Sequence, residues 1–165
     1  MKDIKGFENE YRYLSNFYTC DVPIRLSYDV PGTQNVRMIS VIFPNSEAAF
    51  HAFKCFKDIN NPTEHEIENF TRFTQYTPSE AKRYGRLLKI NVKYWDSVKD
   101  QVMERVLTAK FNHNPKLRFK LVATDDAYLE ETNDWNDTYW GVCDGIGQNK
   151  LGELLMKLRD KFKGN

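Results

Sequence analysis

Cysteine, long apolar runs and a charge excess of one sign are all scarce in this sequence. Its three cysteines, Cys20, Cys55 and Cys143, lie far apart and form no C-x-x-C pair. We therefore expect neither a disulfide framework nor a zinc site, and a reducing cytoplasm is the expected location. No run of about 18 apolar residues occurs and the first residues contain no apolar signal segment, so no membrane partner is expected.

The net charge of +1 excludes a protein that coats nucleic acid through a general basic surface. This value results from a cancellation along the chain. Residues 125–144 contain seven acids and no Lys or Arg, whereas the segments on either side are basic. An acidic, Trp-containing segment between basic flanks is compatible with a polar site, and a solvated acidic loop explains it equally well.

The order of patterns along the 165 residues indicates a single domain of α+β type in which helices dominate and strands are few and short. The first 43 residues are expected to be extended, with a turn at Pro31-Gly32 before a strand. Thr63 and Thr77 each precede a Glu at the third helical position, which predicts two capped helices. Further helices are expected over 46–57, 96–111, 115–122 and from about Asn149 onward, with short strands over 36–43, 128–131 and 139–142.

Common nucleotide and metal motifs are absent from the sequence. Gly145, Gly147 and Gly152 have the wrong spacing for a dinucleotide fingerprint, and no βαβ pattern precedes them. The loop does lead into a helix near Asn149, where backbone N–H groups could hold an anion. An ordinary capped loop explains the same residues.

A polar stripe lies on the otherwise apolar helix from Ser46. Glu47 and Lys54 are seven residues apart and lie within about 20° of each other around the helix axis, with His51 nearby. Burying an acid, an imidazole and an ammonium on one face is costly unless they face a cavity or each other. The stripe is either part of a site or a structural ion pair.

Two further groups of residues could contact a nucleotide. Lys82, Arg86 and Lys89 are expected on one face of the helix after Thr77, as a phosphate-contacting rim or a solvated basic face. Asp137 and Trp140 stand three apart, a pair suited to holding a sugar and stacking a base. A core Trp with an Asp that caps a turn is the alternative.

Four ordered blocks of the sequence resemble the NADAR (YbiA-like) family. They are similar to its N-terminal element, its helix with Glu and Lys, its Trp-to-Lys-Phe helix and its C-terminal W-G…N-x-L-G block, and together they span about residues 6–160. In this sequence the blocks are Tyr11-Arg-Tyr-Leu-Ser-Asn-Phe17, Asn45-Ser-Glu-Ala-Ala-Phe-His-Ala-Phe-Lys54, Tyr94 to Phe111, and Asn136-Asp-Thr-Tyr-Trp-Gly141 with Gly147-Gln-Asn-Lys-Leu-Gly152 and Leu154 to Arg159.

The resemblance implies a cytoplasmic hydrolase of N-glycosidic bonds on ADP-ribosyl or ribosylamino nucleotides, which needs no cofactor and no metal. The first reading that it implies is removal of ADP-ribose from guanine bases of DNA. The second is clearance of phosphorylated ribosylamino-pyrimidine intermediates of riboflavin synthesis, and the third is a non-catalytic ADP-ribose-binding module. The oligomeric state is left open.

The resemblance also implies which residues form the site. Catalytic roles fall to Glu47, Lys54 and Asp137. Two positions depart from the family pattern, because Ala48 replaces its His and His51 replaces its Gln. The stretch from Glu130 to Asp137 is one residue longer than in the family pattern, and Glu131 rather than Glu130 is assigned to the acidic position of that pattern. The implied substrate-binding residues are Arg12, Asn16, Arg86, Trp95, Glu131, Trp140, Gly147 and Asn149.

A chemical hypothesis joins these residues. Cleavage of a C1′–N bond develops positive charge at the sugar, so Glu47 is expected to act as general acid or base. A desolvated Lys54 could form a Schiff base with C1′, and direct attack by water is the alternative.

Overall fold

The computed structural model describes residues 3–164, and the chain divides into two compact units. We call residues 19–113 the helical unit, and residues 3–18 with 114–164 the terminal unit. The single domain expected over residues 1–165 stays a prediction. In the described part of the chain, no helix combines the length and the apolar character needed to cross a membrane.

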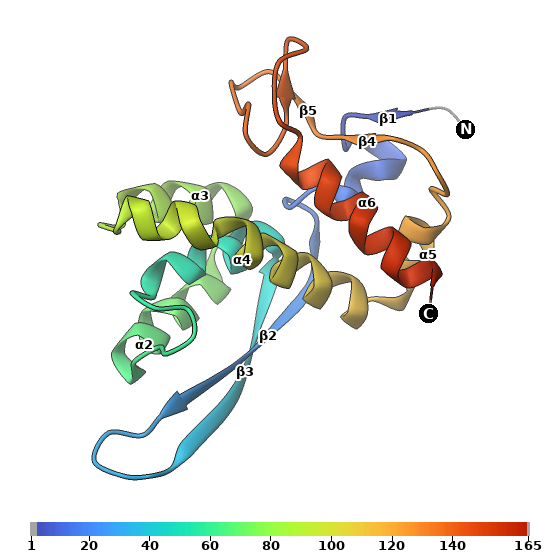
Figure 1. Ribbon diagram of the computed structural model, residues 1–165. Coiled ribbons are helices and arrows are strands. Elements are labelled where there is room, and N and C mark those ends of the chain that lie inside the picture. Colours follow the sequence, from blue (N-terminus) through green and yellow to red (C-terminus); the bar gives the residue numbers. More distant parts are fainter. Residues whose placement is uncertain (1–2, 165) are drawn as a thin grey trace. The chain divides into compact units, whose positions relative to one another are not determined.

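The helical unit begins with a hairpin of strands β2 (Thr19–Asp29) and β3 (Val36–Asn45). The strands are antiparallel, and they extend beyond the helices of the same unit (Figure 1). Alternate residues of β2 are buried from Val22 to Tyr28, which is the pattern of a strand with one face on the core. The predicted strand and turn are confirmed, since Gly32 at the turn has φ +74°. Strand β3 continues two residues beyond the predicted 36–43, and β2, with 11 residues, is longer than the short strands expected.

The helices of the helical unit follow the caps that the sequence contains. Thr63 and Thr77 each accept a hydrogen bond from the backbone N–H of the third helical residue, whose Glu side chain bonds back, so both predicted capping boxes are confirmed. The helices are α1 (Ser46–Ala52), η2 (Phe53–Cys55), α2 (Glu64–Arg72), η3 (Phe73–Gln75), α3 (Pro78–Leu87) and α4 (Val92–His113).

Two helix ends differ from their predicted approximate positions. The helix expected over 46–57 ends at Cys55, because Phe56 is extended and donates its N–H to the carbonyl of Phe53. The long helix α4 begins four residues before the predicted Asp96. Its start is set by Asn91, whose side chain accepts from the N–H of Tyr94 at 3.1 Å and whose carbonyl accepts from that of Trp95 at 2.9 Å.

A cluster of phenylalanines forms the centre of the helical unit. Phe70 of α2 packs edge-on against Phe43 and Phe53, with ring centroids 4.9 and 5.3 Å away, and stacks on Phe56 at 4.8 Å. Phe43, Phe53 and Phe70 have no solvent exposure. Since each buried aromatic side chain contributes a large apolar area, this cluster fixes η2, and with it Lys54, against α2 and β3.

The terminal unit consists of short elements and two helices. The two-residue strands pair in parallel, β1 with β4 and β5 with β6. Residues 9–14 form a 3-10 helix, so the prediction of an extended N-terminal segment is wrong there. The strand predicted over 139–142 is wrong as well, because only its last residue is in a strand. The elements are β1 (Ile4–Lys5), η1 (Asn9–Leu14), α5 (Pro115–Val122), β4 (Leu129–Glu130), β5 (Thr132–Asn133), β6 (Val142–Cys143) and α6 (Lys150–Lys163).

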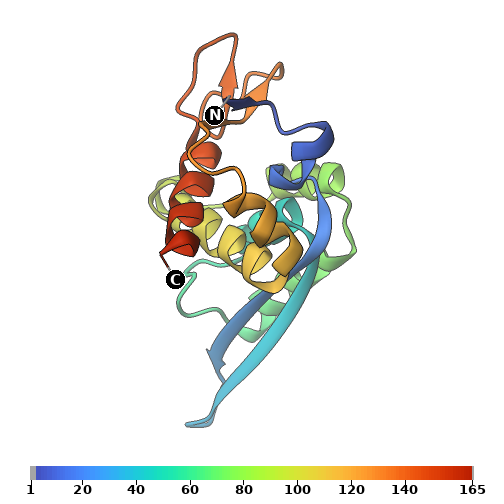
Figure 2. The ribbon, with the colours of Figure 1, turned by 90° about the vertical axis from the view of Figure 1, so that its right-hand side faces the viewer.

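Helices α5 and α6 lie side by side in the terminal unit (Figure 2). A buried arginine of α6 joins them to the segment that follows α5. Arg159 donates from Nη1 to Thr124 Oγ1 at 3.0 Å and to the carbonyl of Ala127 at 2.7 Å. The helix predicted from about Asn149 onward is confirmed, and its Leu151, Leu155 and Leu158 are buried.

Replacing Arg159 with methionine is expected to lower the free energy of unfolding by about 3 kcal/mol, because a buried carbonyl and hydroxyl lose a charged donor. Thermal unfolding followed by circular dichroism measures the loss. Arg159→Lys retains a cation and is expected to lose less, and Lys163→Met at the exposed end of α6 is the matched control. A melting temperature of Arg159→Met equal to that of the control would contradict the structural role.

Candidate functional site

Helix α1 carries a buried pair of side chains that can exchange a proton. Asn45 caps the helix by accepting from the N–H of Ala48 at 2.7 Å, which places Glu47 in the first turn and His51 one turn later. His51 Nε2 lies 3.1 Å from Glu47 Oε1. The side chain of Glu47 is only 12% exposed and that of His51 only 8%, so water competes little for this hydrogen bond.

The environment of His51 favours its neutral form. Burial lowers the pKa of His51, and this outweighs the opposite effect of its hydrogen bond to Glu47. A neutral imidazole that donates from Nε2 leaves Nδ1 without a proton, and Nδ1 has no hydrogen-bond partner within residues 3–164. Nδ1 instead faces the backbone of Gly85 on α3. The pair therefore holds the Glu47 carboxylate in a fixed direction.

Gly85 is the residue that admits the His51 ring. A Cβ at position 85 would lie 2.2 Å from His51 Nδ1 and 2.6 Å from its Cγ. Gly85→Ala is expected to displace the imidazole, break its bond to Glu47, and lower kcat about tenfold or more, with a loss of about 1–3 kcal/mol in stability. Steady-state kinetics and thermal unfolding measure both effects.

A second substitution separates the clash from other effects of Gly85→Ala. The double variant Gly85→Ala/His51→Ala removes the ring, so its melting temperature is expected to rise above that of Gly85→Ala while kcat stays low. Unchanged kcat and melting temperature in the single variant would show that the two helices adjust without cost.

Lys54 lies one turn beyond His51, in η2, and its ammonium faces an aromatic ring. Lys54 Nζ is 5.4 Å from the centroid of the Trp95 ring, and Trp95 packs against Phe50 at 5.2 Å. Burial is the largest cause that lowers the pKa of Lys54. Glu47 raises it, and the cations Arg86 and Lys99 lower it further. A lysine with a lowered pKa is more nucleophilic at neutral pH.

A cavity of about 430 Å³ opens at Lys54 in the helical unit. Its size falls in the range of small-molecule sites. The described residues that line it include three lysines, Lys54, Lys57 and Lys89, and no acid. Tyr94 and Trp95 supply aromatic surface. A cavity with this lining suits an anionic ligand that carries a ring.

The basic residues near α3 do not form the single helical face that the spacing predicts. Arg86 is exposed in the last turn of α3, but the helix ends at Leu87, and Leu88 has extended backbone angles. Lys89 therefore lies outside the helix, and it lines the cavity of Lys54. The prediction of three cations on one helix is wrong for this residue, because the chain turns before the third position.

Asp137 of the terminal unit caps a turn. Its Oδ1 accepts from the backbone N–H groups of Tyr139 at 3.2 Å and Trp140 at 2.9 Å. The side chain of Asn133 accepts from the N–H of Asp137 at 3.0 Å. The ring of Trp140 packs edge-on against Tyr139. The turn-capping alternative raised by the sequence is what the structure shows for this oxygen, and a catalytic role of Asp137 stays a prediction.

The glycine loop before α6 does not present the row of free N–H groups expected for an anion site. The N–H groups of residues 148–151 donate to the carbonyls of Thr138, Gly141, Tyr139 and Trp140, respectively. A Cβ at Gly147 would lie 2.1 Å from the carbonyl oxygen of Gly141, so glycine is required for this approach. The N–H groups of residues 148–151 are therefore engaged within the unit, and the binding roles expected of Gly147 and Asn149 stay predictions.

Asn149 instead holds the strand segment of the terminal unit. Its side chain accepts from the N–H of Glu131 at 3.0 Å and donates to the carbonyl of Leu129 at 2.8 Å. Thr132 Oγ1 donates a hydrogen bond of 2.9 Å to the carboxylate of Glu130. Arg12 is exposed on η1, and Asn16 is buried just beyond it. The binding roles predicted for Arg12, Asn16, Glu131 and Trp140 stay predictions.

Of the residues expected from the sequence, Glu47, Lys54, Arg86 and Trp95 lie in the helical unit, and their roles stay predictions. The sequence reasoning missed Gly85 and Lys57. A glycine inside a predicted helix was the available signal for the first. In the described chain, no group of three or more His, Cys, Asp or Glu side chains is placed to hold a metal ion.

Comparisons with known proteins agree with these features. The sequence model of the NADAR domain matches residues 4–163. The chain is 40% identical to N-glycosidase YbiA of Escherichia coli (strain K12) over 122 residues, 73% of this chain and 71% of that protein. It is 33% identical over 128 residues to the chloroplastic riboflavin biosynthesis protein PYRR of Zea mays, a stretch that is 74% of this chain and 20% of that protein.

A solved structure supports the same relationship. The NMR structure of the E. coli protein YbiA superposes with a TM-score of 0.71 at 35% identity, covering 99% of this chain and 87% of that one. The α+β, helix-dominated fold class expected from the sequence is thereby confirmed. The family model covers nearly the whole chain, and the relative that is 40% identical to it is an N-glycosidase. The chain therefore belongs to the NADAR family of N-glycosidases.

Proposed function

We propose that the chain hydrolyses the N-glycosidic bond of a phosphorylated ribosylamino nucleotide. The observation that carries this proposal is Lys54, an amine with a lowered pKa that lies beside Trp95 in a cavity lined by cations and by no acid among the described residues. An amine nucleophile requires a carbonyl-like carbon, and the C1′ of a ribosylamine provides one when the sugar ring opens to an imine.

The reaction divides into two steps on residues of the helical unit. Lys54 first passes a proton to the Glu47 carboxylate, and the neutral amine then attacks C1′ of the open-chain imine. Glu47 returns this proton to the departing amine as a Schiff base forms between Nζ and C1′. Glu47, now a carboxylate, then accepts a proton from the water that adds to C1′, and Lys54 leaves with the sugar aldehyde released. His51 orients Glu47 throughout by donating to Oε1.

The cations of the cavity would hold the phosphate. Lys57 and Lys89 line it together with Tyr94, and the exposed Arg86 lies on the neighbouring helix. Lysine binds phosphate as a point charge, and the aromatic rings offer a surface on which a pyrimidine can stack. The maize relative at 33% identity is a riboflavin biosynthesis protein, which supports a ribosylamino-pyrimidine as the substrate class.

Removal of ADP-ribose from guanine bases of DNA is the second candidate. The observation in its favour is the exposed basic stretch with Arg86 and Lys89, which could follow a polyanion. The chemistry at C1′ is the same for both substrates, since each joins a ribose carbon to an exocyclic amine.

One experiment separates the candidates. The purified protein is incubated with a ribosylamino-pyrimidine phosphate and, separately, with an oligonucleotide that carries ADP-ribosylated guanine, and mass spectrometry identifies the products. We expect release of the free amine and ribose phosphate from the first substrate. Turnover of the oligonucleotide alone would favour the second candidate, and turnover of neither would overturn the proposal.

A further inference from the structure

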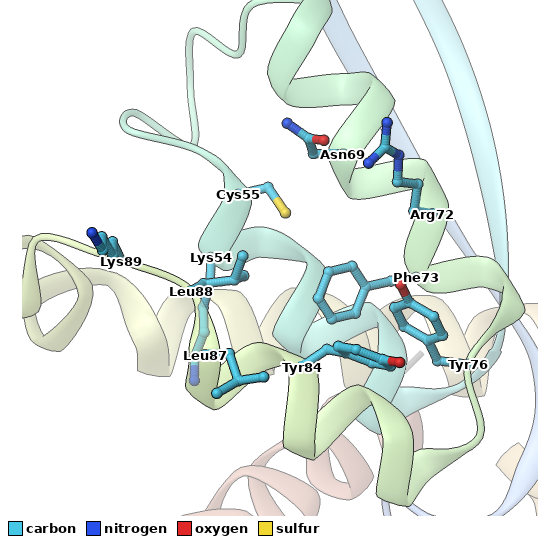
Figure 3. Close-up of a pocket in the computed structure, with 10 residues that line it drawn as sticks. All are labelled: Lys54, Cys55, Asn69, Arg72, Phe73, Tyr76, Tyr84, Leu87, Leu88 and Lys89. Carbon is cyan, nitrogen blue, oxygen red and sulfur yellow. The ribbon is translucent and has the colours of Figure 1, made fainter.

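A second cavity of about 380 Å³ lies beside the first in the helical unit. It is formed by α2, η2, η3, α3 and the segment after α3, so every wall belongs to one compact unit (Figure 3). Of the residues that the sequence analysis singled out as candidates for a site, only Lys54 and Lys89 lie in its wall. The role of this cavity is therefore not explained by the proposed reaction.

One wall of the second cavity is aromatic. The rings of Tyr76 and Tyr84 stack with centroids 4.6 Å apart and planes 25° from parallel, and Phe73 packs edge-on against Tyr76 at 5.1 Å. The three rings gather at one side of the cavity (Figure 3). Tyr84 is 37% exposed, so part of its surface is open to a ligand. Such a wall suits a planar ring because stacking needs no specific hydrogen bonds.

The charged side chains that line the second cavity are all cationic. Lys54, Arg72 and Lys89 line it, and no Asp or Glu does so among the described residues. Within residues 3–164, Arg72 forms no ion pair, although it is a planar donor suited to binding phosphate through two nitrogens. Burial raises the pKa of the Cys55 thiol to about 12, so this residue contributes neutral surface rather than a thiolate.

The two cavities adjoin each other. Lys54, Cys55 and Lys89 line both, so a ligand that is long enough can occupy the two at once. The first cavity holds the reactive amine, and the second holds aromatic rings and an arginine. Among the described residues, the shared lining of the two cavities contains cations and no acid, which suits a ligand with an anionic group.

We propose that the second cavity is a nucleotide-binding site, with the base against Tyr76 and Tyr84 and the phosphate at Arg72. The ligand is either the distal half of a substrate whose ribose lies at Lys54 or a separate mononucleotide. The site does not depend on the chemistry of Lys54, so it can be tested by binding in the absence of any turnover.

The test measures binding of AMP and of ribose 5-phosphate, which lacks the base, by isothermal titration calorimetry. Arg72→Gln is expected to weaken both ligands about tenfold, through loss of a charged contact to phosphate. Tyr84→Leu is expected to weaken AMP about tenfold and leave ribose 5-phosphate unchanged. Arg37→Gln, on the hairpin strand β3 and outside both cavities, is the matched control and keeps wild-type affinity. Circular dichroism verifies that each variant is folded.

Binding of ADP-ribose shows whether the ligand is the distal half of a substrate or a separate mononucleotide. If it spans both cavities, Lys57→Gln in the first cavity weakens ADP-ribose but not AMP. If the site takes a separate mononucleotide, Lys57→Gln affects neither, and the Arg72 and Tyr84 results still support the site. AMP affinities of Arg72→Gln and Tyr84→Leu within twofold of wild type, or no measurable AMP binding to the wild-type protein, would overturn it.

Discussion

Glu47→Gln is expected to lower kcat by a factor of about 10² to 10⁴, the range that a general acid or base contributes. The amide has nearly the same shape as the carboxylate and can still accept a hydrogen bond from His51, so the fold is expected to persist. What it loses is the ability to give a proton to the departing amine and to take one from water. The measurement is steady-state hydrolysis of the ribosylamino-pyrimidine phosphate.

The burial of Glu47 makes this variant informative. Its side chain is 12% exposed and its Oε1 is 3.1 Å from His51 Nε2, so bulk water offers no easy substitute for the missing acid. The control is Glu64→Gln, an exposed acid in the first turn of α2, which is expected to keep wild-type kcat. Wild-type activity in a folded Glu47→Gln protein would remove this residue from the mechanism.

Lys54→Met is expected to abolish the covalent intermediate and lower kcat at least about a thousandfold, since losing a covalent nucleophile costs more than this in other enzymes. Borohydride reduction during turnover, followed by mass spectrometry, is expected to fix the sugar on wild-type Lys54 and to leave Lys54→Met unmodified. Lys93→Met, at an exposed lysine of α4 outside the cavity, is the matched control, and it is expected to retain the trapped adduct.

The pH dependence of trapping follows from the pKa of Lys54. Only the neutral amine attacks C1′, and burial lowers this pKa, so adduct formation is expected to rise with pH and to level off at a lower pH than for an ordinary lysine. Arg86→Gln removes a cation that lowers the pKa and moves the profile to higher pH. Glu47→Gln removes an acid that raises it and moves the profile to lower pH.

These outcomes separate the two mechanisms that the sequence left open. A direct attack by water gives no reducible adduct, and Lys54→Met would then alter KM more than kcat, because the residue would serve only as a cation near the substrate. An adduct on another lysine would place the nucleophile elsewhere in the cavity.

Much of the architecture could be predicted from local patterns. The capping boxes at Thr63 and Thr77 set helix starts by hydrogen bonds within four residues, so a short window of sequence suffices. The polar stripe of Glu47, His51 and Lys54 follows from helical periodicity alone. The contact between Glu47 and His51 follows from the same periodicity, since residues four apart on a helix are neighbours.

Some of the errors arise because contacts from other segments of the chain override a local signal. The loop before α6 contained glycines and a helix start, and these indicated free N–H groups. The carbonyls of residues 138–141 bind those donors instead. Asp137 was similarly ambiguous, because a carboxylate beside a Trp can bind a sugar or cap a turn, and only its two backbone partners show the capping role.

The sequence by itself determined the family blocks, the helix caps and the stripe of acid, imidazole and amine, because each depends on residues that are close along the chain. Only the tertiary structure decided what faces that stripe. Gly85 reaches His51 from another helix, Trp95 meets Lys54 across more than 40 residues of chain, and Arg72 and Tyr84 form a second cavity beside the first. Such contacts depend on how apolar faces pack, and no short window of sequence contains that information.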